Sequence, residues 1–229
     1  MKKYHIAISS IINRHEKFYN EIISGKNIIK DYLENNNISI LEGFIQNVKI
    51  VYEFYKKVYC TDKKNRIVFC GINPGRKGAG KTGVPFFDYM SLSNILASVK
   101  NNDSEQSAQF IWSVISECGI EDFFNNVYLT NICWLGFTKD KKNINYYEFD
   151  ENIKELIFNE FLKEMRIIKP KIIFSLSNEV HNDLIRLKTK FNENWEINNN
   201  LKHPYFCSFN NTDEWRKKYL ETIKSKTSA

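Results

Sequence analysis

The sequence predicts an α/β protein in which helices cover both faces of a mainly parallel sheet. Three short apolar runs, at residues 66–72, 127–132 and 172–176, have the length and composition of buried strands. Amphipathic helical segments separate them, so strands and helices alternate along the chain. This alternation is typical of a parallel sheet that binds ligands at the carboxyl ends of its strands. The 229 residues suffice for one such domain, and we expect a single domain over residues 1–229.

The first part of the chain is predicted to be helical. Apolar side chains recur at helical spacing from Ser10 to Leu33, with a break near Gly25, and form a helical extension within residues 1–45. A further helix is predicted over residues 46–59, with apolar side chains on one face and lysines on the other. This helix leads into the first strand of the sheet.

The rest of the chain repeats the pattern. In order, it contains a helix near residues 105–118, a strand at 127–132, a helix over 152–168 and a strand at 172–176. Pro170 ends the second of these helices because it cannot continue the helical hydrogen bonding. Ser177 is a plausible cap for a last helix that runs to Leu187. A less regular extended stretch then leads to His203.

Composition and cysteine content narrow the class of protein. The net charge of +6 suits a polyanionic partner without requiring one. No apolar run approaches the length that spans a bilayer, so we expect no membrane association. The five cysteines are odd in number and include no C-x-x-C pair, which speaks against a disulfide framework and against zinc or iron–sulfur sites. A reducing, cytoplasmic setting fits best.

The most informative segment is the glycine-rich loop at residues 71–88. Within it, Gly75–Thr82 fits the pattern G-x-x-x-x-G-K-[ST], in which backbone N–H groups and a lysine hold nucleotide phosphates. Such a loop needs a helix that begins at the Gly-Lys-Thr. The next residues, Gly83-Val84-Pro85, are a poor helix start, and no later strand ends in an aspartate for magnesium. The sequence therefore disfavours a P-loop.

Taken as a whole, the loop resembles a different active site. Gly71-Ile-Asn-Pro-Gly75 and Gly78-Ala-Gly-Lys-Thr-Gly-Val-Pro-Phe86 resemble the first motif of the single-strand-selective monofunctional uracil-DNA glycosylases and their bacterial relatives, a uracil-glycosylase-like family of unknown function. Asn131-Ile-Cys-Trp-Leu135 is similar to that family's uracil-recognising N-x-C-P-L segment, and His203-Pro204 to its second catalytic motif. The motifs stand in the family's order, and the resemblance covers about residues 46–220.

The resemblance implies both a fold and an activity. The fold is a three-layer αβα sandwich with a central, mainly parallel four-stranded sheet. The activity is that of a monofunctional DNA glycosylase of base excision repair, which flips out uracil or a related damaged base and hydrolyses its N-glycosidic bond. The partner would be single- or double-stranded DNA, no metal or organic cofactor is required, and we expect a monomer.

The chemistry of these side chains suits the binding of a flipped pyrimidine. Phe86, held by Gly83 and Pro85, offers a flat apolar face, unless it belongs only to the core. Asn131 offers a donor and an acceptor that complement the 4-carbonyl and N3–H of uracil, whereas cytosine presents the reverse pattern. Its alternative role is to satisfy the backbone at a strand end. Backbone N–H groups around Ile72 and Phe86 would add hydrogen bonds to the base.

Two further residues are candidates for the bond-breaking step. Negative charge builds on the departing base, and His203 is the candidate donor to its 2-oxygen. The other histidines, His5, His15 and His181, have no supporting context in the sequence. Asn73 would orient the attacking water, which is the role of this position in the resembled family. Asp88 either helps to hold water or caps a helix that begins at Tyr89.

Basic and aromatic residues near the motifs are candidates for DNA contact. Arg76, Lys77 and Lys81 would contact phosphates, or else are solvated loop charges. The family's serine-proline-arginine wedge is absent after Pro204, and Tyr205-Phe-Cys-Ser-Phe209 stands in its place. We expect Tyr205 and Phe206 to insert between bases or to stack on unpaired ones. Trp134 replaces the family's proline, which bears on the width of the base pocket.

Two alternatives stand beside the glycosylase. One is a nucleic-acid-binding protein that keeps the fold but has lost catalysis. The other is a P-loop nucleotide-binding protein that uses Gly75–Thr82.

Overall fold

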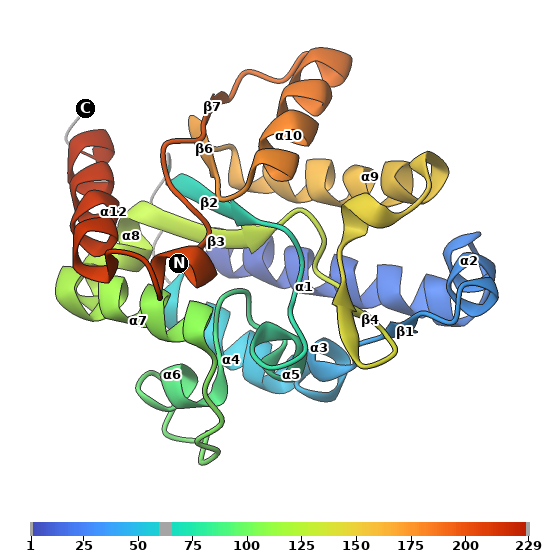
Figure 1. Ribbon diagram of the computed structural model, residues 1–229, viewed down its shortest axis with the longest axis horizontal. Helices are drawn as coiled ribbons and strands as arrows, with labels where there is room; N and C mark the ends of the chain where they lie inside the picture. Colours follow the sequence, from blue (N-terminus) through green and yellow to red (C-terminus); the bar gives the residue numbers. More distant parts are fainter. Residues whose placement is uncertain (1, 60–65, 228–229) are drawn as a thin grey trace.

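The predicted parallel sheet is the centre of the protein. A computed structural model describes residues 2–59 and 66–227. Its main sheet has the strand order β3-β2-β6-β7, and all neighbouring strands are parallel (Figure 1). The strands are β2 (Ile67–Gly71), β3 (Val127–Asn131), β6 (Ile172–Ser175) and β7 (Glu196–Asn198). The predicted α/β fold with a central four-stranded parallel sheet is confirmed.

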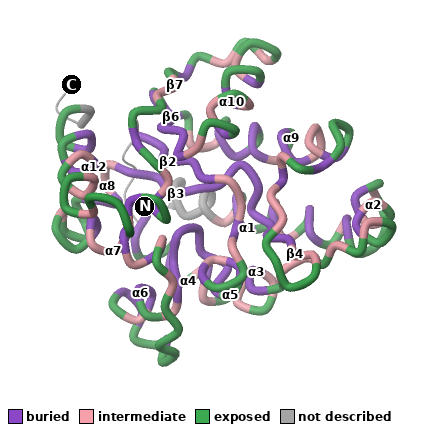
Figure 2. The backbone as a smooth tube through the Cα atoms, viewed as in Figure 1, coloured by how far each residue is buried: buried purple, intermediate pink, exposed green. Residues whose placement is uncertain are grey.

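Helices flank the sheet on both faces, and the aromatic core shows which ones cover which face. The helices are α1 (Lys2–Ile23), α2 (Ile29–Asn35), α3 (Gly43–Gln46), α4 (Val48–Val58), α5 (Ala79–Thr82), α6 (Tyr89–Ser93), α7 (Gln106–Cys118), α8 (Ile120–Asn126), α9 (Glu151–Ile168), α10 (Asn178–Phe191), α11 (Pro204–Cys207) and α12 (Thr212–Thr227). On one face, Phe69 packs against Tyr219 of α12; on the other, Tyr128 packs against Tyr55 of α4. Figure 2 shows β2, β3 and β6 as buried strands, whereas the edge strand β7 is partly exposed.

Capping side chains define where two of the predicted helices begin. The Ser177 hydroxyl accepts a hydrogen bond from Val180 N at 3.2 Å, as predicted, and α10 continues four residues beyond Leu187. Asp88 accepts from Ser91 N at 2.7 Å and caps α6. Asp88 is fully buried, and its second oxygen accepts from Glu105 N at 2.6 Å. The helix-cap interpretation of Asp88 is therefore confirmed, and Asp88 does not line the cavity at the carboxyl ends of β2 and β3.

A small antiparallel sheet was not predicted. It has the order β1-β4-β5 and consists of β1 (Ser39–Ile40), β4 (Phe137–Lys139) and β5 (Lys142–Ile144). The β4–β5 hairpin turns at Asp140 and Lys141, which have φ values of 51° and 60°. Both central residues of such a turn need positive φ, and the usual markers Asn-Gly and Asp-Gly are absent. The hairpin matters because it contacts the glycine-rich loop after β2.

The N-terminal helix packs against two later helices. The predicted break near Gly25 is real, since α1 ends at Ile23 and Gly25 has a φ of 69°. Helix α1 contacts α4 and α9. Among the described helices, none combines the length and the apolar composition that a bilayer span requires. Of the five cysteines, Cys60 lies outside the described residues and the other four are free thiols.

Two glycines allow a paired test of backbone conformation and packing. Gly83 and Gly25 both have positive φ, but a Cβ at Gly83 would lie 2.5 Å from the Cα of Phe44, whereas the nearest atom to a Cβ at Gly25 is Lys30 Cδ at 3.7 Å. Gly25→Ala should lower the free energy of unfolding by about 1 kcal/mol through backbone strain alone. Gly83→Ala should cost about 3 kcal/mol, because steric overlap adds to the strain. Urea denaturation measures both losses, and equal losses would contradict the packing at Gly83.

Candidate active site

A cavity of about 410 Å³ opens at the carboxyl ends of β2 and β3. Parallel α/β sheets bind ligands at this edge, outside the carboxyl ends of their strands. All five residues predicted for catalysis or base binding line it: Ile72, Asn73, Phe86, Asn131 and His203. Of the predicted DNA-binding residues, Arg76, Lys77 and Tyr205 line it as well. One cavity thus brings together the three sequence motifs.

The parallel register places two of these side chains over one glycine. Gly71, the last residue of β2, is the register partner of Asn131, the last residue of β3. A Cβ on Gly71 would lie 2.4 Å from Asn131 Oδ1 and 2.6 Å from Phe86 Cζ. The amide and the aromatic ring therefore converge on the space that a side chain at position 71 would occupy.

Phe86 is held in an unusual backbone conformation. Its φ is +63°, a left-handed value that costs an L-residue about 1–2 kcal/mol. The buried Thr82 hydroxyl stabilises this turn by donating to Phe87 O at 2.7 Å and accepting from Val84 N at 3.2 Å. Strain of this kind persists only where the surroundings determine the conformation, and it is common at functional sites.

The amide of Asn131 is a buried polar group without a protein partner. Only 4% of the residue is exposed, and within the described part of the chain its side chain makes no hydrogen bond. The backbone beside it is fixed, because Ile132 N donates to Gly71 O at 3.0 Å and Cys133 N to Ile72 O at 3.1 Å. The residue lines the cavity, and its amide atoms are not among the fully buried side-chain atoms that lack a partner. A ligand in the cavity with a matching donor and acceptor would bond to both ends of the amide.

Asn73, in contrast, is held by the segment that follows β5. Its Oδ1 accepts from Tyr146 N at 3.1 Å, and its Nδ2 donates to Ile144 O at 3.2 Å. If the amide were rotated by 180°, Nδ2 would face the N–H of Tyr146 and Oδ1 would face the carbonyl of Ile144. The two hydrogen bonds therefore fix the orientation of the Asn73 amide. One lone pair of Oδ1 and one N–H of Nδ2 stay available to the cavity.

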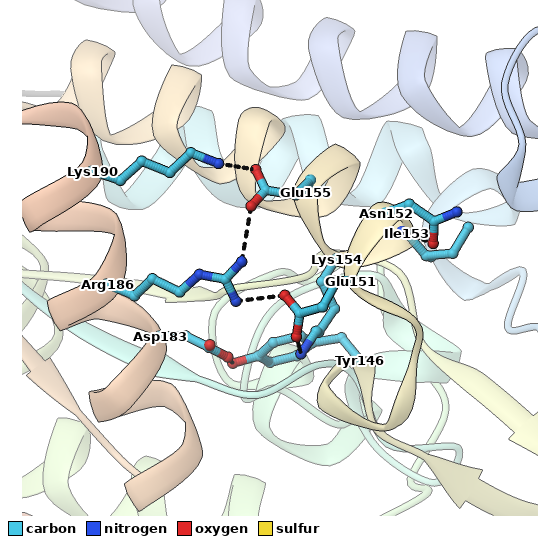
Figure 3. A network of polar contacts seen from close by, with 9 residues as sticks. All are labelled: Tyr146, Glu151, Asn152, Ile153, Lys154, Glu155, Asp183, Arg186 and Lys190. Carbon is cyan, nitrogen blue, oxygen red and sulfur yellow. Dashed lines mark hydrogen bonds and ion pairs between the residues drawn. The ribbon is translucent and has the colours of Figure 1, made fainter.

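Tyr146 connects Asn73 to a polar network between α9 and α10. The Tyr146 hydroxyl donates to Asp183 Oδ2 at 2.8 Å, and Arg186 binds both Glu151 and Glu155 (Figure 3). Burial, followed by the charge of Asp183, raises the pKa of Tyr146 well above its usual value, so the phenol keeps its proton. Burial also raises the pKa of Asp183. The backbone clamp on Asn73 is therefore anchored to α10.

His203 occupies the position before α11 and caps it with its side chain. Its Nδ1 accepts from Tyr205 N at 3.2 Å, which leaves the proton of a neutral ring on Nε2. The residue is partly open to the cavity, yet the surrounding protein displaces enough water to lower the pKa of His203 to about 4. The ring is therefore a neutral Nε2–H donor at physiological pH.

The structure contradicts the P-loop interpretation of Gly75–Thr82. Helix α5 has only four residues and ends at Gly83 with a φ of 77°. Lys81 forms an ion pair with Asp103, and Thr82 is fully buried in the turn described above. Neither side chain lines the cavity, so no phosphate cradle forms here. Phosphate contact by Lys81 stays a prediction without support from the cavity.

Three aromatic residues differ in their relation to the cavity. Tyr205 lines it and is 54% exposed. Phe206 does not line it; it is exposed and packs edge-on against Trp215. Trp134 is buried outside the cavity wall, with its indole N–H bonded to Glu164 Oε2 at 2.9 Å. The residue that replaces the family's proline therefore does not narrow the pocket.

Four polar residues of the cavity wall were not predicted: Glu105, Ser107, Asn143 and Asn145. Asn143 Oδ1 accepts from Arg76 N at 3.0 Å and so ties the hairpin to the glycine-rich loop. Glu105 caps α7 by accepting from Ala108 N at 3.0 Å. Of these four residues, only Glu105 has a role, that of a helix cap, which the sequence pattern can indicate. Within the described residues, no group of three or more His, Cys, Asp or Glu side chains is suited to a metal ion.

Comparisons with known proteins bear on the family and the fold. A family model described as the uracil DNA glycosylase superfamily matches residues 58–224. Among solved structures, the chain is similar to that of wild-type Pedobacter heparinus SMUG2, with 26% sequence identity and a TM-score of 0.70. That match covers 84% of this chain and 89% of the other. No curated protein matches the chain.

The low pKa of His203 allows a direct test of the protonation state and tautomer of its ring. The folded ring should stay neutral from pH 8 down to pH 5 and titrate near 4, against about 6.5 for an unfolded histidine. Because the unfolded chain takes up this proton first, the contribution of His203 to stability should fall as pH decreases from about 6.5 to 4. Long-range ¹H–¹⁵N NMR spectra report both the tautomer and the pKa. Titration near 6.5, or an Nδ1–H tautomer, would contradict this description.

Proposed function

Because the chain belongs to the uracil DNA glycosylase superfamily, we propose that it is a monofunctional DNA glycosylase that excises uracil. Members of the superfamily bind DNA, and membership suggests glycosylase activity. The observation that carries the choice of base is the amide of Asn131, which lines the cavity beside the ring of Phe86 and has no hydrogen-bond partner among the described residues. This pair offers a stacking face and one donor next to one acceptor, which a flipped uracil would satisfy.

In the proposed complex, Asn131 reads the edge of the base. Its Nδ2 donates to O4 of uracil and its Oδ1 accepts from N3–H. Cytosine would place an amino group against Nδ2 and an unprotonated N3 against Oδ1. Two lost hydrogen bonds in a buried site disfavour cytosine strongly, because the site's own polar groups stay unpaired. Phe86 supplies the face on which the pyrimidine ring stacks.

His203 and Asn73 act on the bond itself. The C1′–N1 bond breaks with its electron pair on the base, and the neutral Nε2–H of His203 donates to the developing charge on O2. Asn73 uses its remaining lone pair to hold the water whose oxygen bonds to C1′. The proton that this water loses ends on the departing base. An amide is too weak a base to drive the step, so orientation and charge stabilisation supply most of the rate.

The surroundings of the cavity suit a DNA strand. Arg76 and Lys77 are exposed on its wall, where they would contact phosphates. A second cavity of about 600 Å³ shares Lys77, Glu105 and Tyr205 with the first. Tyr205 and Phe209 pack edge to face with ring centroids 5.0 Å apart and are both exposed. These aromatics would stack on bases next to the flipped nucleotide.

Excision of uracil is measured with an oligonucleotide that contains one deoxyuridine, by cleaving the abasic product with alkali. The wild-type protein should release uracil, and Asn73→Ala and His203→Ala should each lower kcat about 10²–10³-fold. His181→Ala is the matched control, because His181 lies on α10 outside the cavity wall and should leave kcat unchanged.

Absence of cleavage with uracil, hypoxanthine, xanthine or oxidised pyrimidines would refute the proposal that the protein is a DNA glycosylase. Binding of uracil-containing DNA without cleavage would then favour the alternative that has lost catalysis.

Gly71 gives a test of the base pocket rather than of the reacting groups. Gly71→Ala should push the Asn131 amide and the Phe86 ring apart and raise KM for uracil-containing DNA about tenfold or more. Gly75→Ala, whose Cβ would meet only Asn143 Nδ2 at 3.3 Å, should have a much smaller effect. Steady-state kinetics distinguish the two variants, and an unchanged KM for Gly71→Ala would exclude Asn131 and Phe86 from base binding.

A further inference from the structure

Glu164 of α9 is a fully buried carboxylate with four protein donors. Its Oε1 accepts from the hydroxyls of Tyr128 at 2.8 Å and Thr130 at 2.9 Å. Its Oε2 accepts from Trp134 Nε1 at 2.9 Å and lies 3.2 Å from His15 Nε2. Burial of a carboxylate is costly unless such partners replace water. The mechanism proposed above does not use this cluster.

His15 closes the cluster from the N-terminal helix. Its ring stacks on the indole of Trp134 with centroids 4.0 Å apart and planes 11° from parallel. The same ring contacts Glu164 through Nε2. Both His15 and Glu164 are shielded from solvent, and α1 runs behind the sheet in Figure 1. Without the His15 ring, water would reach Glu164 Oε2 and compete for the Trp134 N–H.

Glu164 forms hydrogen bonds to residues on both sides of Asn131 in the sequence. Thr130 precedes Asn131, and its hydroxyl donates to Glu164 while accepting from Trp134 Nε1 at 3.1 Å. Trp134 follows three residues later and is bonded to the same carboxylate. Side-chain hydrogen bonds therefore join Thr130 and Trp134, at the two ends of this turn, to each other and to Glu164. Since the Asn131 amide makes no hydrogen bond within the described part of the chain, the bonded residues on either side of it determine where it lies.

We propose that His15 is a positioning residue for the base-reading amide of Asn131, which it acts on through Trp134 and Glu164. This gives α1 a role in base selection as well as in packing. This proposal for His15 rests on the proposed function of Asn131 in reading the base. Because Asn131 would contact the base both before and during bond cleavage, loss of its position weakens binding more than turnover.

The test compares variants of His15 in the full-length protein. His15→Ala should raise KM for uracil-containing DNA about tenfold, keep kcat within about twofold, and reduce the preference for uracil over cytosine. His15→Phe keeps an aromatic ring on Trp134 but lacks the bond to Glu164, and should give a smaller increase in KM. Asn131→Ala combined with His15→Ala should be no worse than Asn131→Ala alone.

Arg14→Ala is the matched control. Arg14 lies on the same helix, and its Nη1 is 3.8 Å from Glu160 Oε2 of α9, so its removal alters the same helix contact without removing a bond to Trp134 or Glu164. It should leave KM and base preference unchanged. If Arg14→Ala raises KM as His15→Ala does, or if His15→Ala leaves the uracil preference intact, the proposal is overturned.

An NMR measurement separates failure of this proposal from failure of the glycosylase. In a protein that releases no base, His15→Ala should still shift the side-chain amide signals of Asn131 and the indole signal of Trp134, while Arg14→Ala should not. An unchanged Asn131 amide signal in His15→Ala refutes the positioning role whatever the enzymatic result.

Discussion

The parallel register that pairs Gly71 with Asn131 is the constraint on which the candidate site depends. It ends β2 and β3 at the same level, and the missing side chain at Gly71 leaves room for the Asn131 amide and the Phe86 ring. Any larger residue would displace both groups. The left-handed backbone at Phe86 and the Thr82 bonds that hold it follow from the need to bring the ring into this space. The other polar groups are arranged around this pair.

Two asparagines in the cavity differ in a way that suits different tasks. Asn73 is clamped by backbone groups of residues 144–146, and through Tyr146 it is anchored to α10. The side chain of Asn131 has no hydrogen-bond partner among the residues that the structure describes, but Thr130 and Trp134 on either side of it are bonded to buried Glu164. A group that holds a water needs a fixed orientation, whereas a group that reads a base needs its donor and acceptor unoccupied. This contrast supports the division of roles that we propose.

Much of the fold and of the cavity could be predicted from the sequence. Continuous apolar runs marked β2, β3 and β6, and strand ends of a parallel sheet meet at one edge, which places Asn73, Asn131 and His203 near one another. The β4–β5 hairpin escaped prediction because Asp140 and Lys141 are not typical of its turn. The clamp on Asn73 uses a backbone N–H, which leaves no mark in the sequence. A role for His15 could not be predicted, because its hydrogen-bond partner Glu164 lies 149 positions away in the sequence.

We propose that one cavity, at the carboxyl ends of β2 and β3, holds both uracil and the water that releases it. A crystal structure with DNA that carries a 2′-fluorinated deoxyuridine, which resists cleavage, tests this most directly. We expect the uracil ring to stack on Phe86, O4 and N3–H to bond to Asn131, O2 to lie within hydrogen-bond distance of His203 Nε2, and a water to lie between Asn73 and C1′. A base bound elsewhere, or bound here with Asn131 still unpaired, would contradict it.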